Sequence, residues 1–221
     1  MVVVTMRIIA FGDIHMSLGN FRNIPGIDSV DLIIITGDLT NFGGREEARK
    51  IVEAIRAVNP NLLALAGNLD QKDVDDYLGE AGINLHGQGR VVNNVGIFGV
   101  GGSNYTPFKT PNEFSEEELA AFLSAGYKQV RDADSHILVS HTPPVDTVTD
   151  RIASGMHVGS KAVRKFIEDK QPVLCLTGHI HEARADDFIS NTQILNPGMI
   201  KDGYWIDITL ENGTITASLA P

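Results

Sequence analysis

The fold of this protein is decided by the stretch Leu174-Cys175-Leu176-Thr177-Gly178-His179-Ile180-His181. Its apolar residues predict a short buried strand, and this strand ends at a glycine followed by two histidines one residue apart. Side chains at positions i and i+2 of an extended chain point the same way, so both imidazoles can face one site. The stretch Ile8-Ile9-Ala10-Phe11-Gly12-Asp13-Ile14-His15 has the same order, with an aspartate in place of the first histidine.

Three further apolar runs each end in one side chain that can bind a metal, namely Asp38, Asn68 and His141. Loops at the C-terminal ends of parallel strands share one crevice, so we expect these side chains to converge with the two pairs above. The predicted metal ligands are Asp13, His15, Asp38, Asn68, His141, His179 and His181. Four imidazoles, two carboxylates and one amide exceed what one tetrahedral ion uses, and they suit two divalent ions that share a carboxylate.

The composition favours a globular α/β protein. The chain has 221 residues, of which 43% are hydrophobic, and we expect a single domain over residues 1–221. A net charge of -10 disfavours a protein that neutralises many nucleic-acid phosphates. Cys175 is the only cysteine, which excludes an intrachain disulfide and fits a reducing compartment. Because no signal peptide or transmembrane-length stretch is evident, we expect a cytoplasmic protein without membrane contact.

The order of predicted elements is typical of a parallel sheet in the first half of the chain. Strands are expected at residues 2–11, 31–36, 62–66 and 136–141, and helices at 46–58, 74–78, 115–131 and 160–169. The βαβαβ order of the first half predicts parallel pairing. Past residue 87 we expect more antiparallel pairing, with hairpins at 91–100 and 204–219.

Five motifs in this order resemble those of the calcineurin-like metallophosphoesterases. They are Asp13-x-His15, Gly37-Asp38, Gly67-Asn68-x-Asp70, His141 and Gly178-His179-x-His181. The resemblance implies a four-layer α/β/β/α sandwich of two mixed sheets, with a dinuclear metal site at the strand ends. It also implies that Asp13, His15 and His181 hold one ion, that Asn68, His141 and His179 hold the other, and that Asp38 bridges them.

The activity implied by this resemblance is hydrolysis of small phosphodiesters or phosphomonoesters. Two divalent ions (Mn²⁺, Fe or Zn²⁺) would supply a bridging hydroxide for in-line attack on the phosphorus. A nuclease with the same centre and a noncatalytic scaffold are the alternatives. The acidic composition argues against the first, and the complete ligand set argues against the second.

One position departs from the family pattern. Where the family often has a histidine that assists the leaving group, this chain has Leu69, which predicts a preference for low-pKa leaving groups such as those of aryl diesters. His157 is the candidate catalytic substitute, because it lies in a long connection before a helix whose N-terminus can face an anion. The alternative for His157 is an ordinary loop histidine. Asp70 is expected to orient a ligand or to cap the following helix.

Overall fold

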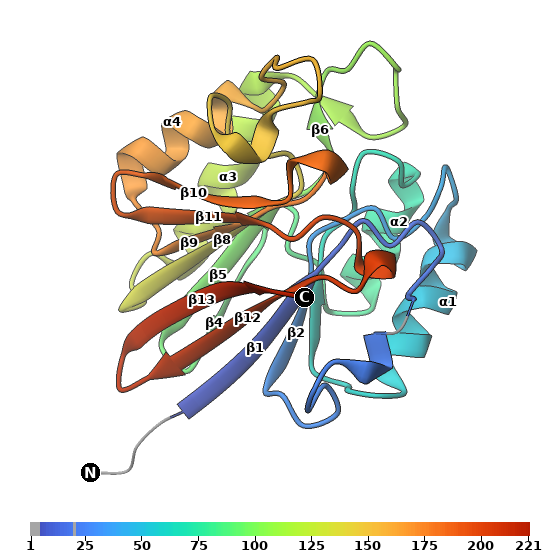
Figure 1. The fold of residues 1–221 in the computed structure, drawn as a ribbon, viewed down its shortest axis with the longest axis vertical. Coiled ribbons are helices and arrows are strands. Elements are labelled where there is room, and N and C mark those ends of the chain that lie inside the picture. The colour runs from blue at the N-terminus through green and yellow to red at the C-terminus, as the bar shows by residue number, and fades with distance from the viewer. Residues whose placement is uncertain (1–4, 20) are drawn as a thin grey trace.

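Two β-sheets packed face to face form the centre of the molecule (Figure 1). The structure is a computed structural model and describes residues 5–19 and 21–221. The first sheet contains β1 (Thr5–Phe11), β2 (Leu32–Ile35), β3 (Leu62–Ala64), β12 (Trp205–Glu211) and β13 (Thr214–Ala220), in the order β13-β12-β1-β2-β3. The second contains β4 (Gly89–Val92), β5 (Val95–Val100), β8 (Ser135–Ser140), β9 (Leu174–Leu176), β10 (Ala185–Ile189) and β11 (Thr192–Asn196), in the order β10-β11-β9-β8-β5-β4. A short pair, β6 (Ser103–Asn104) and β7 (Glu113–Phe114), lies outside both sheets.

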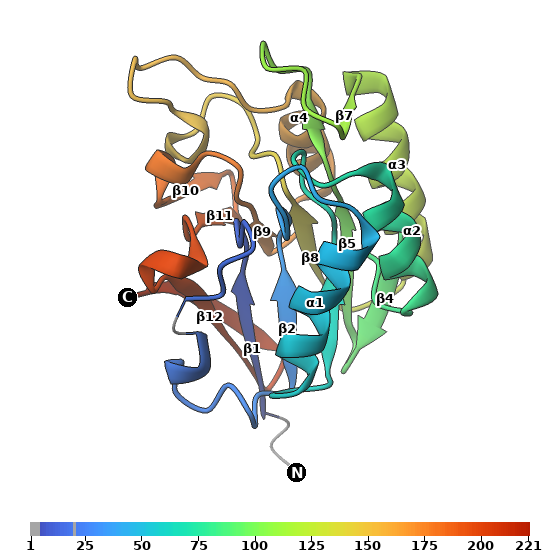
Figure 2. The same cartoon turned by 90° about the vertical axis from the view of Figure 1, so that its right-hand side faces the viewer.

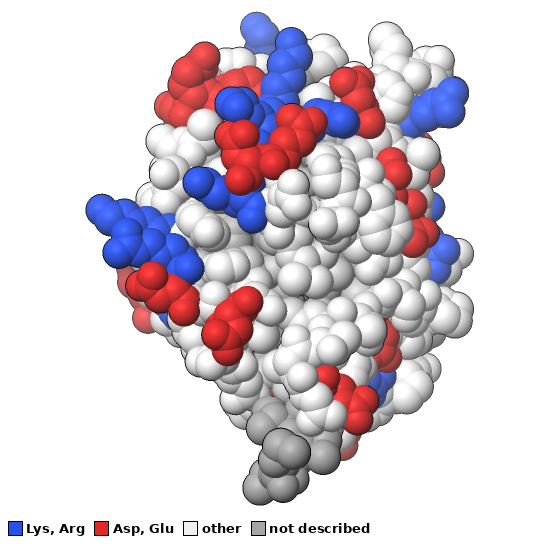
Figure 3. All heavy atoms as spheres, turned by 90° about the vertical axis from the view of Figure 1, so that its left-hand side faces the viewer, with Lys and Arg blue, Asp and Glu red and all other residues white. Residues whose placement is uncertain are grey.

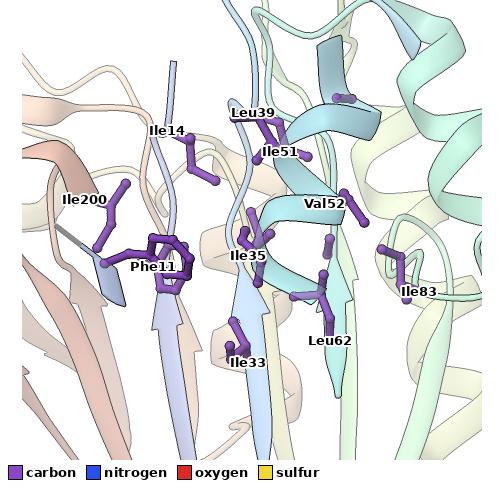
Figure 4. Close-up of a cluster of buried hydrophobic side chains, with 14 of the residues drawn as sticks. Phe11, Ile14, Ile33, Ile35, Leu39, Ile51, Val52, Leu62, Ile83 and Ile200 are labelled. Atoms are coloured by element: carbon purple, nitrogen blue, oxygen red, sulfur yellow. The ribbon is translucent and has the colours of Figure 1, made fainter. Parts of the chain in front are cut away.

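Helices cover the outer face of each sheet. They are α1 (Arg45–Arg56), α2 (Lys72–Glu80), α3 (Glu116–Val130) and α4 (Lys161–Lys170). Figure 4 shows Ile33 and Ile35 of β2 against Ile51 and Val52 of α1 in one buried cluster. A second cluster joins α3 and α4 to β5, β8, β9 and β11. The expected four-layer α/β/β/α sandwich is therefore confirmed.

The strands of the centre are buried on both faces, which explains why they read as continuous apolar runs. In β1, Ile8 and Ala10 point into the core between the two sheets, whereas Ile9 and Phe11 point toward the helices. This alternation follows from the two-residue period of a strand. Within the described residues, no helix combines the length and the apolar character needed to cross a membrane.

Strand pairing agrees with the sequence in the first half and only in part in the second. Strands β1, β2 and β3 are parallel, as expected. Both predicted hairpins form, as β4–β5 and β12–β13, and each turns through two residues of positive φ, Asn93-Asn94 and Asn212-Gly213. However, β5, β8, β9 and β11 are mutually parallel, so antiparallel pairing does not dominate the second sheet. Residues 2–4 of the first predicted strand lie outside the described residues.

The parallel strands of both sheets run toward the same end of the molecule. In Figure 2 the arrowheads of β1 and β2 point the same way as those of β5 and β8. The loops that follow these strands therefore meet at one edge of the sandwich, where ligands of open α/β sheets bind.

Candidate metal centre

The loops after five strands bring all seven predicted ligands together. The contributing strands are β1, β2 and β3 of the first sheet and β8 and β9 of the second, each followed within five residues by one or two ligands. The site therefore lies between the two sheets, and each sheet supplies part of it.

Four of the seven side chains form one cluster. One ligand atom each from Asp13, His15, Asp38 and His181 lies within 4.8 Å of the other three. Nε2 of His15 is 2.9 Å from Nε2 of His181, which in turn is 3.3 Å from Oδ1 of Asp13. Two facing imidazole nitrogens at this distance share either one proton or one cation. Nδ1 of His15 is buried without a hydrogen-bond partner. The short distances between these ligand atoms fit a cation in this cluster.

The other three side chains form a second cluster around the Asn68 amide oxygen. Nε2 of His141 lies 3.0 Å from Asn68 Oδ1, and Nδ1 of His179 lies 2.8 Å from the same atom. Nδ1 of His141 faces the Thr36 carbonyl oxygen at 2.8 Å. Because that oxygen only accepts, the neutral His141 ring carries its proton on Nδ1 and directs the Nε2 lone pair into the site.

Asp38 lies between the two clusters. Its Oδ2 atom is 3.9 Å from Nε2 of His15 and 3.4 Å from Nε2 of His141. Its other oxygen accepts the backbone N–H of Leu69 at 2.9 Å, which fixes the carboxylate plane. One carboxylate oxygen therefore faces donors of both clusters, as a bridge between two cations requires. Mixed nitrogen and oxygen donors of this kind suit divalent transition metals.

The buried charges favour the ligand forms of Asp38 and His179 but not of His141. Burial alone would lower the pKa of His141, but the Asp38 charge outweighs it and raises this pKa to about 9. Burial alone opposes the charged form of Asp38, but the positive field of His141 prevails and lowers the pKa of Asp38 to about 2. Burial, reinforced by His141, lowers the pKa of His179 to about 4. Near neutral pH, Asp38 is thus a carboxylate and His179 a neutral imidazole, which are the forms that bind metals, whereas His141 must release a proton when an ion binds.

Asp70 connects the loops that carry Asp38 and Asn68. Its carboxylate accepts the backbone N–H groups of Leu39, Thr40 and Gly67 at 2.8–3.1 Å, and also the Thr40 hydroxyl at 2.7 Å. Burial and the nearby Asp38 charge raise the pKa of Asp70 to about 7. Gln71, not Asp70, is the N-cap residue of α2. The Asp70 carboxylate therefore orients ligand-bearing loops and does not cap the helix.

The backbone of the site is strained at four candidate ligands. Asp13, His15, Asp38 and His179 have φ values of 48°, 46°, 48° and 69°, in the left-handed region that few residues other than glycine adopt. Such conformations persist only where surrounding structure enforces them, and they cluster at functional sites. Here the N–H groups of Asp13 and His15 donate to the carbonyl groups of Gly37 and Asp38, both at 3.0 Å.

A pocket of about 1120 Å³ opens beside the centre, and it is lined by Asp38, Asn68, His179, His181 and the predicted catalytic residue His157. His157 does not join the cluster of ligands. Instead, its Nδ1 atom lies 2.6 Å from Oδ1 of Asp150, a fully buried carboxylate that also accepts the N–H groups of Thr147 and Gly159. The Asp150 carboxylate thus fixes the ring, with Nδ1 toward Asp150.

The N-terminus of α4 is not free to bind a substrate anion. The expectation that this helix terminus assists His157 at the substrate is therefore wrong. The Glu116 carboxylate accepts the Ser160 hydroxyl at 2.6 Å and the N–H groups of Lys161 and Ala162 at 3.1 and 2.8 Å. A carboxylate of this chain therefore satisfies the groups that would bind a substrate anion.

Thr110 is a site residue that the sequence did not indicate. The Asn68 amide group donates through Nδ2 to the Thr110 hydroxyl at 3.0 Å, which leaves Oδ1 of Asn68 facing the two histidines. Thr110 in turn donates to Glu113 at 2.7 Å. The spacing Thr110-x-x-Glu113 is typical of a helix start, but here it closes a turn.

Comparisons with known proteins agree with this site. The model of the family described as calcineurin-like phosphoesterase matches residues 6–183. The protein MJ1162 of Methanocaldococcus jannaschii is 37% identical over 216 residues, which cover 94% of each chain. The crystal structure of TT1561 of Thermus thermophilus has the same fold, with a TM-score of 0.71 at 16% identity, covering 97% of this chain and 99% of that one.

A dimetal phosphatase from Danio rerio also has this fold, with a TM-score of 0.61 at 12% identity over 97% of this chain and 95% of that one. The family match and the His/Asp cluster support a divalent metal site. The protein therefore belongs to the calcineurin-like phosphoesterases and is a metal-dependent phosphate ester hydrolase.

Proposed function

We propose that this protein hydrolyses small phosphodiesters or phosphomonoesters at a centre of two divalent ions. Asp13, His15 and His181 would hold one ion, Asn68, His141 and His179 the other, and Asp38 would bridge them. The observation that carries this proposal is the position of one Asp38 oxygen within 4.0 Å of an imidazole from each cluster. The Danio rerio protein of similar fold carries the name dimetal phosphatase, which agrees with two ions.

The ions, when bound, would activate a water molecule near neutral pH and neutralise the phosphoryl oxygens. Mn²⁺, Fe and Zn²⁺ all suit this donor set, and the metal available in the cell decides among them. The single buried Cys175 supports a reducing compartment, and we place the protein in the cytoplasm.

His157 would protonate the leaving oxygen. Leu69 has no proton to give, whereas His157 lines the same pocket and is held by Asp150 through Nδ1. This bond places the proton of the neutral ring on Nδ1, so the Nε2 atom of the protonated ring is the one that delivers a proton to substrate. Asp150 is a positioning residue in this scheme.

The metal requirement is tested with the purified protein and 4-nitrophenyl esters of phosphate. We expect hydrolysis to stop after chelation and to return with Mn²⁺. The variant Asp38→Asn should lose at least about 100-fold in kcat/KM, because even partners of metal ligands contribute 10–100-fold. Asp186→Asn, an exposed position on β10, is the matched control and should retain activity. Full activity of metal-free protein would refute the proposal.

The role of His157 is tested by comparing leaving groups. In His157→Gln, kcat/KM for an alkyl phosphodiester should fall about 10²–10⁴-fold, because a poor leaving group needs a proton. The value for a 4-nitrophenyl diester should change less than about threefold, since this leaving group departs as an anion. Equal losses for both substrates would assign His157 a role in folding or binding instead.

A nuclease is the alternative that uses the same centre. The net charge of -10 weighs against it, and the face in Figure 3 carries Lys and Arg side chains interspersed with Asp and Glu. A nucleic-acid-binding surface is typically a basic patch or stripe. Incubation with single-stranded DNA under the conditions that cleave aryl esters distinguishes the two functions.

A further inference from the structure

Exposed apolar side chains gather at the pocket. Nine large hydrophobic side chains are exposed among the described residues, and four of these nine line the pocket beside the metal centre. They are Phe42, Tyr105, Phe108 and Met156, with exposed fractions of 58%, 68%, 82% and 60%. Large apolar groups in water around a pocket mark a place where a ligand binds.

The loops that carry the aromatic rings are attached to the metal centre. The Phe42 N–H group donates to the carbonyl of Leu69, the residue after Asn68, at 3.0 Å. The loop between β6 and β7, which contains Tyr105 and Phe108, is bonded to Asn68 through Thr110. The loops that carry the rings are therefore anchored beside the place where a phosphate would bind.

The β6–β7 loop is also bonded to the connection before α4, which carries Met156. Asn104 donates to the Val158 carbonyl at 3.1 Å and accepts the Thr142 hydroxyl at 2.8 Å. Figure 1 shows both segments at the same end of the molecule. Three loops, each anchored by hydrogen bonds, thus surround the pocket with apolar side chains.

The charge of the pocket limits the substrate to few phosphates. Among the described residues that line it, Lys161 is the only lysine or arginine. A chain of several phosphates would need more cations than the metal centre and one lysine provide. The pocket therefore suits a substrate with one phosphate and an apolar remainder.

We propose that Phe42, Tyr105 and Phe108 bind a planar aromatic group of the substrate while its single phosphate lies at the metal centre. This inference rests on the proposed phosphoesterase function. Aromatic rings attract one another in offset or edge-on geometry beyond their area of contact. An alkyl chain would gain less, because these rings stand largely in water and polar side chains such as Asn104 and Thr106 also line the pocket.

Binding of unreactive phosphonates to the Mn²⁺-loaded protein, measured by calorimetric titration, tests this inference apart from catalysis. Methylphosphonate reports on the centre alone. Phenylphosphonate and cyclohexylphosphonate add six-carbon rings of similar size, of which only the first is planar and aromatic. We expect the phenyl compound to bind about fivefold more tightly than the cyclohexyl compound, which is within the range that aromatic pairs contribute beyond their buried area.

Variants locate the effect. Phe108→Ala and Tyr105→Ala change exposed residues and should leave the fold intact, while reducing the phenyl advantage to less than about twofold in the double variant. Phe188→Ala removes another exposed ring, on β10 outside the pocket, and should keep the full advantage. Equal affinity for the phenyl and cyclohexyl compounds, or an advantage that survives the double variant, overturns the inference.

Two further comparisons separate the possible outcomes. If methylphosphonate does not bind, the proposed function fails and the aromatic site fails with it; if it binds as tightly as phenylphosphonate, only the aromatic site fails. The kcat/KM for adenosine 5′-monophosphate, compared with that for ribose 5-phosphate, identifies the source of the ring. An advantage for the former indicates a nucleobase, and none, with the phenyl advantage present, indicates a simple aryl group.

Discussion

Close packing against Asp38 requires a glycine at position 67, directly before the metal ligand Asn68. A Cβ atom at Gly67 would lie 2.1 Å from Oδ1 and 2.3 Å from the backbone nitrogen of Asp38. Because one of these atoms is backbone, the loop cannot yield without moving Asp38. Gly67→Ala should lower the free energy of unfolding by about 1–3 kcal/mol, as overpacking does, and also reduce the bound metal. Urea unfolding and metal analysis of the purified variant measure both effects.

Gly79→Ala is the matched control for this prediction. Gly79 lies in α2, and an added Cβ would meet no heavy atom within 4 Å. Alanine is the better helix former, so the free energy of unfolding should rise by up to about 1 kcal/mol with unchanged metal content. The close-packing argument fails if the two substitutions shift stability in the same direction.

At the residue scale, the sequence identifies groups that bind a metal but not the groups that orient them. Asp13 and His15 are recognisable because they directly follow an apolar run and both carry side chains that bind metals. Thr110 is not recognisable in this way, since its partner Asn68 is 42 positions away and any hydroxyl in a loop has the same appearance. The role of Asp150 is also not visible in the sequence, because only the fold brings its carboxylate to His157.

The β6–β7 loop is an element whose function in metal binding can be measured. Thr110→Val removes the acceptor of the Asn68 amide N–H and frees the ligand to rotate. Metal affinity should fall about 10–100-fold, as it does when partners of ligands are lost. Titration against a chelating indicator dye gives this affinity directly. Thr106→Val loses a comparable bond to Glu113 in the same turn without touching Asn68, and should change the affinity less than about threefold.

At the scale of elements, local chemistry explains which parts of the fold the sequence predicts. The capping box of Ser115 and Glu118 marks the start of α3, and asparagine and glycine mark the turns of β4–β5 and β12–β13. The hairpin β10–β11 was not predicted. Its edge strand contains Asp186 and Asp187, which oppose a strand prediction, and its turn uses Ser190 at a φ of 53°, a weaker signal than Asn-Gly.

At the scale of the molecule, pairing between distant segments is the part that local patterns do not contain. The C-terminal β12 pairs antiparallel with β1, so that Arg7 lies opposite Thr209 and forms an ion pair with Asp207 at 2.5 Å. Apolar runs indicate that both strands are buried, but not that they are neighbours. The two-sheet arrangement was predicted from the family resemblance of the five ordered motifs. Their side chains can form one metal site only if the ends of these strands lie close together.

Metal binding should stabilise the whole molecule, because the ligands come from both sheets. Asp13, Asp38 and Asn68 follow strands of the first sheet, and His141 and His179 follow strands of the second. An ion that binds only the folded state at 100 times its Kd adds about 2.7 kcal/mol. For a chain of this size, the melting temperature should then rise by about 5–10 °C when Mn²⁺ is added to chelated protein. Calorimetry measures this shift. Asp38→Asn, which removes charge from the bridging position, should show less than half of it, and an equal shift in both proteins would place the metal elsewhere.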